Sequence, residues 1–172
     1  MSEVSLPNEG AVYSDAQADA LYEKIWNFLQ QTNVVDPRNI RKDLMTWRRG
    51  SAQLAIKINA ALDNLSIYSV LLSGVTPTEA LFRHLLHYNV LQRRESLGMM
   101  EKDGKNYIVL KYTMELEMID QDSLQRHIFA LQEIADKLDT ELAEKFGGSM
   151  QFEDWQKMDQ SSVDNLLDNL FG

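Results

Sequence analysis

The sequence predicts an α+β fold, in which an antiparallel five-stranded sheet packs against helices in the order α-β-β-β-α-β-β-α. Two patterns predict it. In three segments, apolar residues recur every three or four positions, which is typical of helices with one buried face. Between these segments, apolar and polar residues alternate, which is typical of strands buried on one side. Short turns join neighbouring strands, so we expect antiparallel hairpins.

The first helix is predicted between Ser14 and about Thr32. Ser14 stands three residues before Gln17, which is the spacing of a capping box that satisfies backbone N–H groups of the first turn. The apolar residues of this segment form one helical face: Ala18, Leu21, Tyr22, Ile25, Phe28 and Leu29. A single apolar face indicates that this helix packs against another layer.

The second helix is predicted from a strong start signal after Gly74. Thr76 is expected to cap the helix, Pro77 to take the first helical position, and Glu79 to complete the capping box. A missing N–H costs nothing at the first helical position, which explains the choice of Pro77. This helix should extend to about Tyr88.

The third helix is predicted after Asp122, which we expect to cap it together with Gln125. Its apolar stripe steps by four and three residues: Leu124, Ile128, Leu131, Ala135, Leu138 and Leu142. Gly147 and Gly148 should end it, because glycine readily adopts the conformation that follows a helix C-terminus.

Two hairpins account for most of the predicted strands. Residues 44–49, LMTWRR, form a short strand, and residues 52–62 alternate between apolar and polar side chains. Asp63-Asn64 provides a tight turn into the return strand at residues 67–73, since both residue types tolerate positive φ. The second hairpin covers residues 90–117, with its turn at Lys102-Asp103-Gly104-Lys105.

Composition is that of an ordinary globular chain. Of its 172 residues, 44% are hydrophobic and 25% are charged, and none is cysteine. The lack of cysteine excludes disulfides and thiolate metal sites and fits a reducing compartment, so we expect a cytoplasmic protein. The net charge of −9 argues against a dominant nucleic-acid role. No apolar run reaches the roughly 20 residues of a membrane helix, so no membrane insertion is expected.

The chain divides into three predicted parts. Residues 1–13 are polar and lack a period, so we expect a flexible N-terminal arm. Residues 14–148 hold the helices and strands of the α+β domain. Residues 149–172 form an acidic amphipathic C-terminal extension, which contains five acidic side chains and one basic side chain, Lys157.

Three segments together carry a resemblance to a known family. They are the central hairpin AQLAIKINAALDNLSIYSVLLS, the capped helix start GVTPTEALFRHLLHYN, and the run MMEKDGKNYIVLKYTMELEMIDQDSLQRHIFALQEIADKL. These segments resemble the YbjN-like proteins and, more distantly, the small chaperones of type III secretion, over about residues 14–146. The resemblance implies a non-enzymatic module that holds a peptide or an unfolded segment of a client, often as a homodimer.

The sequence offers no arrangement typical of catalysis. His84 and His87 lie three residues apart, without the i, i+4 spacing and the Glu of the zinc-hydrolase motif, and His127 has no adjacent acid. Carboxylate pairs such as Glu115 and Glu117 fall at strand ends, where a solvated role is expected. The sequence contains no glycine-rich nucleotide motif either. We therefore expect no enzyme, no metal ion and no cofactor.

A basic segment with an aromatic residue lies between the first helix and the central hairpin. Its basic residues are Arg38, Arg41, Lys42, Arg48 and Arg49. Aromatic side chains such as Trp47 can stack on bases, which would suit nucleic acid, but the chain as a whole is acidic. A solvated face, or an electrostatic patch for an acidic segment of a client or of the chain's own tail, fits better.

The tail carries an apolar pattern of its own. Its apolar residues fall at i, i+3, i+4, i+7 and i+8: Val163, Leu166, Leu167, Leu170 and Phe171. About ten residues cannot hold a helix alone in water, so this face must dock somewhere. The candidates are the chain's own domain, a second copy, and a groove on another protein.

The return strand at residues 67–73 is apolar on both faces, so one face either lies open and takes a partner or is covered by the first helix or the tail. The residues that we expect to contact a partner there are Trp47, Tyr68, Val70 and Leu72. The leading hypothesis is a chaperone-like module that holds a client segment on an apolar sheet face or edge. An assembly adaptor whose C-terminal helix docks into a partner is the alternative, and a nucleic-acid-associated regulator is a weaker one. The sequence leaves the client and the oligomeric state open, a homodimer included.

Overall fold

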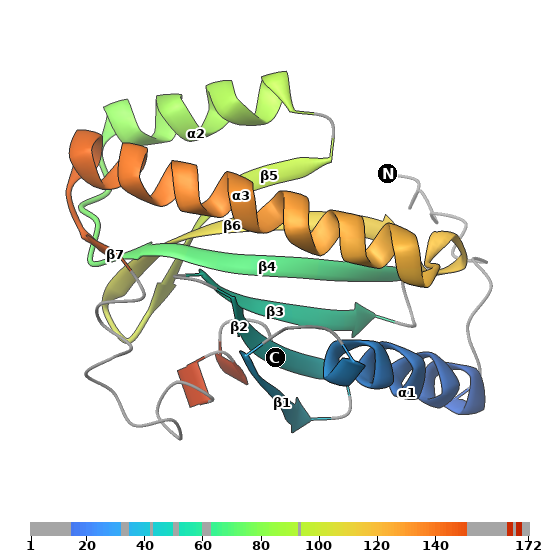
Figure 1. Cartoon of the computed structure of the whole chain (residues 1–172). Helices are drawn as coiled ribbons and strands as arrows, with labels where there is room; N and C mark the ends of the chain where they lie inside the picture. The colour runs from blue at the N-terminus through green and yellow to red at the C-terminus, as the bar shows by residue number, and fades with distance from the viewer. Residues whose placement is uncertain are drawn as a thin grey trace, which may run out of the picture.

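Figure 1 shows the computed structural model of the chain. It describes residues 15–31, 35–41, 43–49, 52–59, 63–92, 94–150, 165–166 and 168–169. Within these residues, three helices pack on an antiparallel sheet, which confirms the predicted α+β class and element order. The elements are α1 (Asp15–Gln31), β1 (Val35–Arg41), β2 (Leu44–Arg49), β3 (Ala52–Asn59), β4 (Asn64–Ser73), α2 (Glu79–Leu91), β5 (Glu95–Lys102), β6 (Lys105–Glu115), the short 3-10 helix η2 (Leu116–Met118), α3 (Gln121–Phe146) and β7 (Ser149–Met150).

The sheet has the strand order β1-β2-β3-β4-β6-β5, and β7 pairs with the end of β4. The five predicted strands are present. The sequence did not predict β1, which contains Pro37, or the two-residue β7. Proline is tolerated in β1 because this strand lies at the edge of the sheet, where an N–H can be missing without breaking a ladder on both sides.

The N-caps of α2 and α3 both lie two residues away from the predicted positions. The side chain of Thr78, and not that of Thr76, accepts the backbone N–H of Leu81, so α2 begins at Glu79. In α3 the cap is Asp120, and not Asp122. Asp120 Oδ1 accepts the Ser123 N–H at 2.7 Å, and Ser123 Oγ accepts the Asp120 N–H at 3.1 Å. The predicted N-terminal arm and the Ser14 cap lie outside the described residues.

The predicted turn at Lys102-Asp103-Gly104-Lys105 is confirmed at the backbone level. At the predicted Asp63-Asn64 turn, Asp63 has a φ of 51°, but Asn64 already belongs to β4 and pairs with Asn59. In the β5–β6 turn, Asp103 and Gly104 have φ values of 52° and 73°. Two successive positive φ angles match the twist of antiparallel strands, which explains why this hairpin closes tightly.

The sheet separates two apolar clusters. The helix-side core combines one face of the sheet with the inner faces of α1, α2 and α3. All six residues of the predicted α3 stripe are buried in it, which confirms that helical pattern. The second cluster, which we call the distal face, lies on the opposite side of the sheet and is formed by Leu44, Ala55, Val70, Tyr107 and Val109.

Candidate functional site

Two of the four residues expected on an open sheet face lie in the helix-side core. Trp47 is 0% exposed and Leu72 is 1% exposed. The expectation that they face outward is wrong for a physical reason in each case. Trp47 lies two residues after Met45 in β2, so both side chains point to the same side of the sheet, toward the helices. At Leu72 a bulge between Val70 and Leu72 breaks the alternation of β4, so Leu71 and Leu72 both face the helices.

The other two residues, Tyr68 and Val70, do lie on the distal face. Val70 belongs to the buried cluster, and Tyr68 is half-buried against it. Ile40 of β1 and Met100 of β5 pack against the same cluster, so apolar contacts cross the sheet from one edge strand to the other. The five cluster residues are at most 6% exposed, so the distal face is a second buried apolar cluster rather than an open patch.

Lysine side chains lie around the distal face. Strand register places Lys111 opposite Tyr68, and Tyr68 opposite Ala55 of the cluster, so these side chains share one face. Lys111 Nζ lies 5.7 Å from the centroid of the Tyr68 ring, and Lys105 Nζ lies 5.9 Å from that of Tyr107. The distal face is therefore apolar at its centre and basic at its margin.

Part of the C-terminal extension lies on this surface. Leu166 is half-buried and packs against the distal cluster. Its neighbours Asn165 and Asn169 are exposed, and Asp168 is half-buried. The other residues of the predicted tail pattern lie outside the described residues: Val163, Leu167, Leu170 and Phe171.

The basic segment is divided between two strands. Arg38 and Arg41 belong to β1, and Arg48 and Arg49 belong to β2. The register pairs Arg38 with Thr46 and Arg41 with Leu44. Lys42 lies outside the described residues. The role of this segment as an electrostatic patch therefore stays a prediction.

A separate apolar surface lies on the outer side of α2. Phe82, Leu86, Val90 and Leu91 are 42%, 66%, 81% and 65% exposed. Three of them are spaced four residues apart and so lie along one side of the helix. The sequence did not predict this surface, because it placed Val90 and Leu91 at the start of the second hairpin, whereas both belong to α2 and β5 begins only at Glu95.

The outer edge of β5 is partly occupied by the chain itself. Asn89 of α2 donates from Nδ2 to the Leu97 carbonyl at 2.9 Å and accepts the Leu97 N–H on Oδ1 at 2.7 Å. A client strand that pairs with an edge needs such backbone groups free. At Leu97, it would first have to displace the Asn89 amide.

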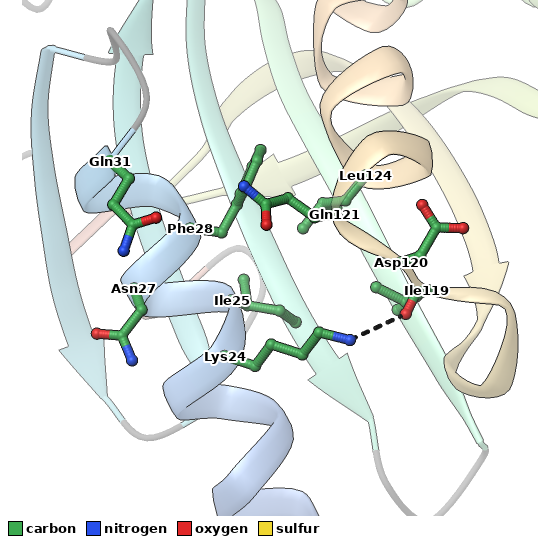
Figure 2. A pocket seen from close by; sticks show the side chains of 9 residues that line it. All are labelled: Lys24, Ile25, Asn27, Phe28, Gln31, Ile119, Asp120, Gln121 and Leu124. Carbon is green, nitrogen blue, oxygen red and sulfur yellow. Dashed lines mark hydrogen bonds between the residues drawn. The ribbon is translucent and has the colours of Figure 1, made fainter.

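A small hollow separates α1 from the start of α3 (Figure 2). The apolar side chains of Ile25, Phe28 and Leu124 line it, and Lys24 Nζ donates to the Ile119 carbonyl at 3.4 Å across one end. Its volume is about 230 Å³, below the roughly 300–1,000 Å³ that is usual for small-molecule sites. The hollow has the size to take a side chain of a docked segment rather than a substrate.

Two of the histidines, His84 and His127, lie beside cations. Lys145 Nζ donates to His84 Nδ1 at 3.1 Å, and burial, followed by this positive charge, lowers the pKa of His84. Burial, followed by the charge of Arg94, likewise lowers the pKa of His127. Within the described residues, no group of three metal-ligating side chains comes together.

One polar cluster joins Arg94, which precedes β5, to β6 and α3. The Tyr112 hydroxyl lies 3.1 Å from Arg94 Nη1 and 3.2 Å from His127 Nε2, and its ring stacks on that of His127 at 4.6 Å between centroids. A tyrosine held by both partners and by stacking is fixed in place, which suits a structural role. The sequence did not predict this cluster because its members lie far apart along the chain.

Comparison with solved structures defines the class of fold. A chain of "Crystal Structure of the ExsC-ExsE Complex" matches at a TM-score of 0.60 and 12% identity, covering 72% of this chain and 93% of its own. A chain of "Structure of the HopA1-SchA Chaperone-Effector Complex" matches at 0.58 and 15%, covering 74% and 99%. At these identities, the likeness shows that all three share one fold.

The sequence itself identifies the family. The family model described as T3SS (YopN, CesT) and YbjN peptide-binding chaperone 1 matches residues 19–154. The chain belongs to this family of peptide-binding chaperones, which confirms the resemblance of the three segments and the prediction of a non-enzymatic protein. No curated protein matches the chain significantly. In the part of the chain that the structure describes, no helix is long and apolar enough to cross a membrane.

Proposed function

We propose that the protein holds an apolar segment of a client protein on the distal face of its sheet. The observation that carries the proposal is the second apolar cluster, on the side of the sheet away from the three helices. A domain of this size needs one core, and its helix-side core already includes all three helices. The family's peptide-binding activity supports an interaction role for the second cluster. A cytoplasmic location is part of the same proposal, and fractionation of host cells would test it.

Substitution of a distal-face residue that is not part of the helix-side core tests this proposal. Tyr68 meets that condition, whereas Leu72 does not. A photoreactive amino acid at position 68 should cross-link a client in the native host, and Tyr68→Ala should reduce the amount of client that co-purifies. Tyr88, half-buried against the helix-side core, provides the matched control. Equal client recovery from folded Tyr68→Ala and Tyr88→Ala variants would contradict the proposal.

The adaptor alternative assigns the partner to the C-terminal extension instead. It is favoured by the apolar pattern of that segment, and it predicts that deleting residues 161–172 abolishes partner binding. The proposed client site predicts the opposite, since the deletion leaves the distal face in place. The packing of Leu166 on the chain's own sheet supports the client site.

We further propose that the outer surface of α2 pairs with a second copy of the chain. Burial of its four exposed apolar side chains would stabilise a dimer by about 25 cal/mol for each Å² of apolar area removed from water. Leu86→Asp should convert a dimer into a monomer, as measured by light scattering on a sizing column. Ala130→Asp adds the same charge at an exposed position of another helix, α3, and it should leave the mass unchanged. A wild-type protein that is monomeric in solution would contradict this part of the proposal.

A further inference from the structure

The C-terminal segment on the distal face is an addition to the family's domain. The family model ends at residue 154, whereas Leu166 lies beyond it and still packs against the distal cluster. Residues 165, 166, 168 and 169 have helical backbone. The exposed Asn165 and Asn169 flank the half-buried Leu166 in sequence, so the segment presents one side to the sheet. The surface that we assign to a client thus already holds a piece of the chain.

Charge complementarity favours this placement. The C-terminal extension, residues 149–172, carries five acidic side chains against one lysine. The distal face presents Lys111 beside Tyr68 and Lys105 beside Tyr107. Lys57 belongs to the same face, because it alternates along β3 with Ile56 and Ile58, which face the helices. An acidic segment with an apolar side therefore fits both the centre and the margin of the surface.

We propose that the C-terminal segment around Leu166 is a tethered stand-in for the client, and that the distal face selects acidic amphipathic segments. The segment occupies the surface in the absence of a client, and a client of the same chemistry displaces it. This inference rests on the proposed function, to which it adds the chemical class of the client and an internal competitor.

The physical basis for displacement is the low intrinsic stability of the segment. A short helical segment is unstable alone in water, so it keeps its helix only while it is docked. Attachment to the domain favours docking, because tethering raises the effective concentration of the segment at the surface. A free client must compete with the tethered segment. Its apparent dissociation constant therefore equals the intrinsic constant divided by the fraction of molecules in which the surface is open.

The test uses the full chain and a defined probe. The probe is a fluorescein-labelled synthetic peptide of residues 159–172, and its binding is followed by fluorescence anisotropy. Leu166→Asp should release the tethered segment, so the probe should bind this variant about tenfold more tightly than the wild type. Asn165→Asp adds the same charge at an exposed neighbour and should behave as the wild type. Circular dichroism checks that each variant is folded.

Two further experiments test where the probe binds and whether binding depends on its charge. In the Leu166→Asp chain, Tyr68→Ala should remove probe binding, and Tyr88→Ala should not. A probe with lysine in place of Asp164 and Asp168 should bind at least about tenfold more weakly, since its charge then repels the lysine margin. Added salt should weaken the acidic probe only.

The outcomes separate this inference from the proposed function. Equal probe binding by the wild type and Leu166→Asp would show that the segment does not cover the surface, and would overturn the inference. Probe binding that survives Tyr68→Ala, or that ignores the probe's charge, would overturn it too. So would a complete lack of probe binding. None of these results decides whether a client binds, because the cross-linking at position 68 tests that without the probe.

Discussion

The turn between α3 and β7 offers a quantitative test of the geometry that leads the chain into its C-terminal extension. Gly148 has a φ of 93°, and a Cβ built on it would lie 2.7 Å from Val75 Cγ2 and 3.0 Å from the Ser73 carbonyl oxygen. Both neighbours are buried, and Ser73 pairs with Ser149 of β7. Gly148→Ala therefore meets two separate obstacles, one of backbone strain and one of packing.

Their magnitudes can be worked out separately. A positive φ costs an L-residue roughly 1–2 kcal/mol, and forcing an extra methyl group into a filled site costs about 1–3 kcal/mol. We expect Gly148→Ala to lower the free energy of unfolding by about 2–5 kcal/mol. Val75→Ala removes the nearest clashing carbon, so the cost of Gly148→Ala should fall in that background by part of the packing cost, about 1–2 kcal/mol. The Ser73 carbonyl remains and keeps part of the clash.

A double-mutant cycle with urea unfolding, followed by circular dichroism, measures this coupling. Gly147 provides the control, because it also has a positive φ, 73°, but a Cβ there meets nothing within 4 Å. Gly147→Ala should therefore cost backbone strain alone and show no coupling to Val75. Equal costs of Gly148→Ala with valine and with alanine at position 75 would refute a clash between residue 148 and Val75.

The remaining predictions concern the caps and the histidines. Thr78→Ala should destabilise the protein by about 1 kcal/mol in urea unfolding, whereas Thr76→Ala should have little effect; the reverse order would contradict the observed start of α2. Burial, followed by the charge of Arg94, lowers the pKa of His127 below its unfolded value near 6.5, so unfolded chains bind more protons and stability should fall as pH drops below about 6.5. His127→Gln should flatten that dependence in thermal melts at several pH values, leaving the part due to His84, whose pKa is lowered in the same direction. An unchanged pH profile would show that His127 does not contribute.

Local patterns predicted much of the fold because they report local physics. The α3 stripe is correct at every position, since a helix repeats its buried face at a fixed period. The turn at Asp103-Gly104 is correct because few residue pairs tolerate two positive φ angles. Strand β1 was missed because Pro37 argues against a central strand, and only the sheet order reveals that β1 is an edge.

The candidate site was predicted less well. Tyr68 and Val70 lie on the expected face, but Trp47 and Leu72 do not. Alternation sorts the side chains of a strand into two sets, and it does not say which set meets the helices. The bulge in β4 then turns Leu72 toward the helices, and no residue in that strand predicts a bulge from the sequence.

By itself, the sequence determined the helices, the hairpins, their order, the family and the acidic amphipathic character of the C-terminal extension, because each depends on residues close together in the chain or on overall pattern. The tertiary structure alone decided which of the two apolar sheet faces the helices cover. It also decided that Leu166 packs on the other face and that Phe82, Leu86 and Val90 are exposed. Burial depends on what the rest of the chain places against a side chain, and that information is not local.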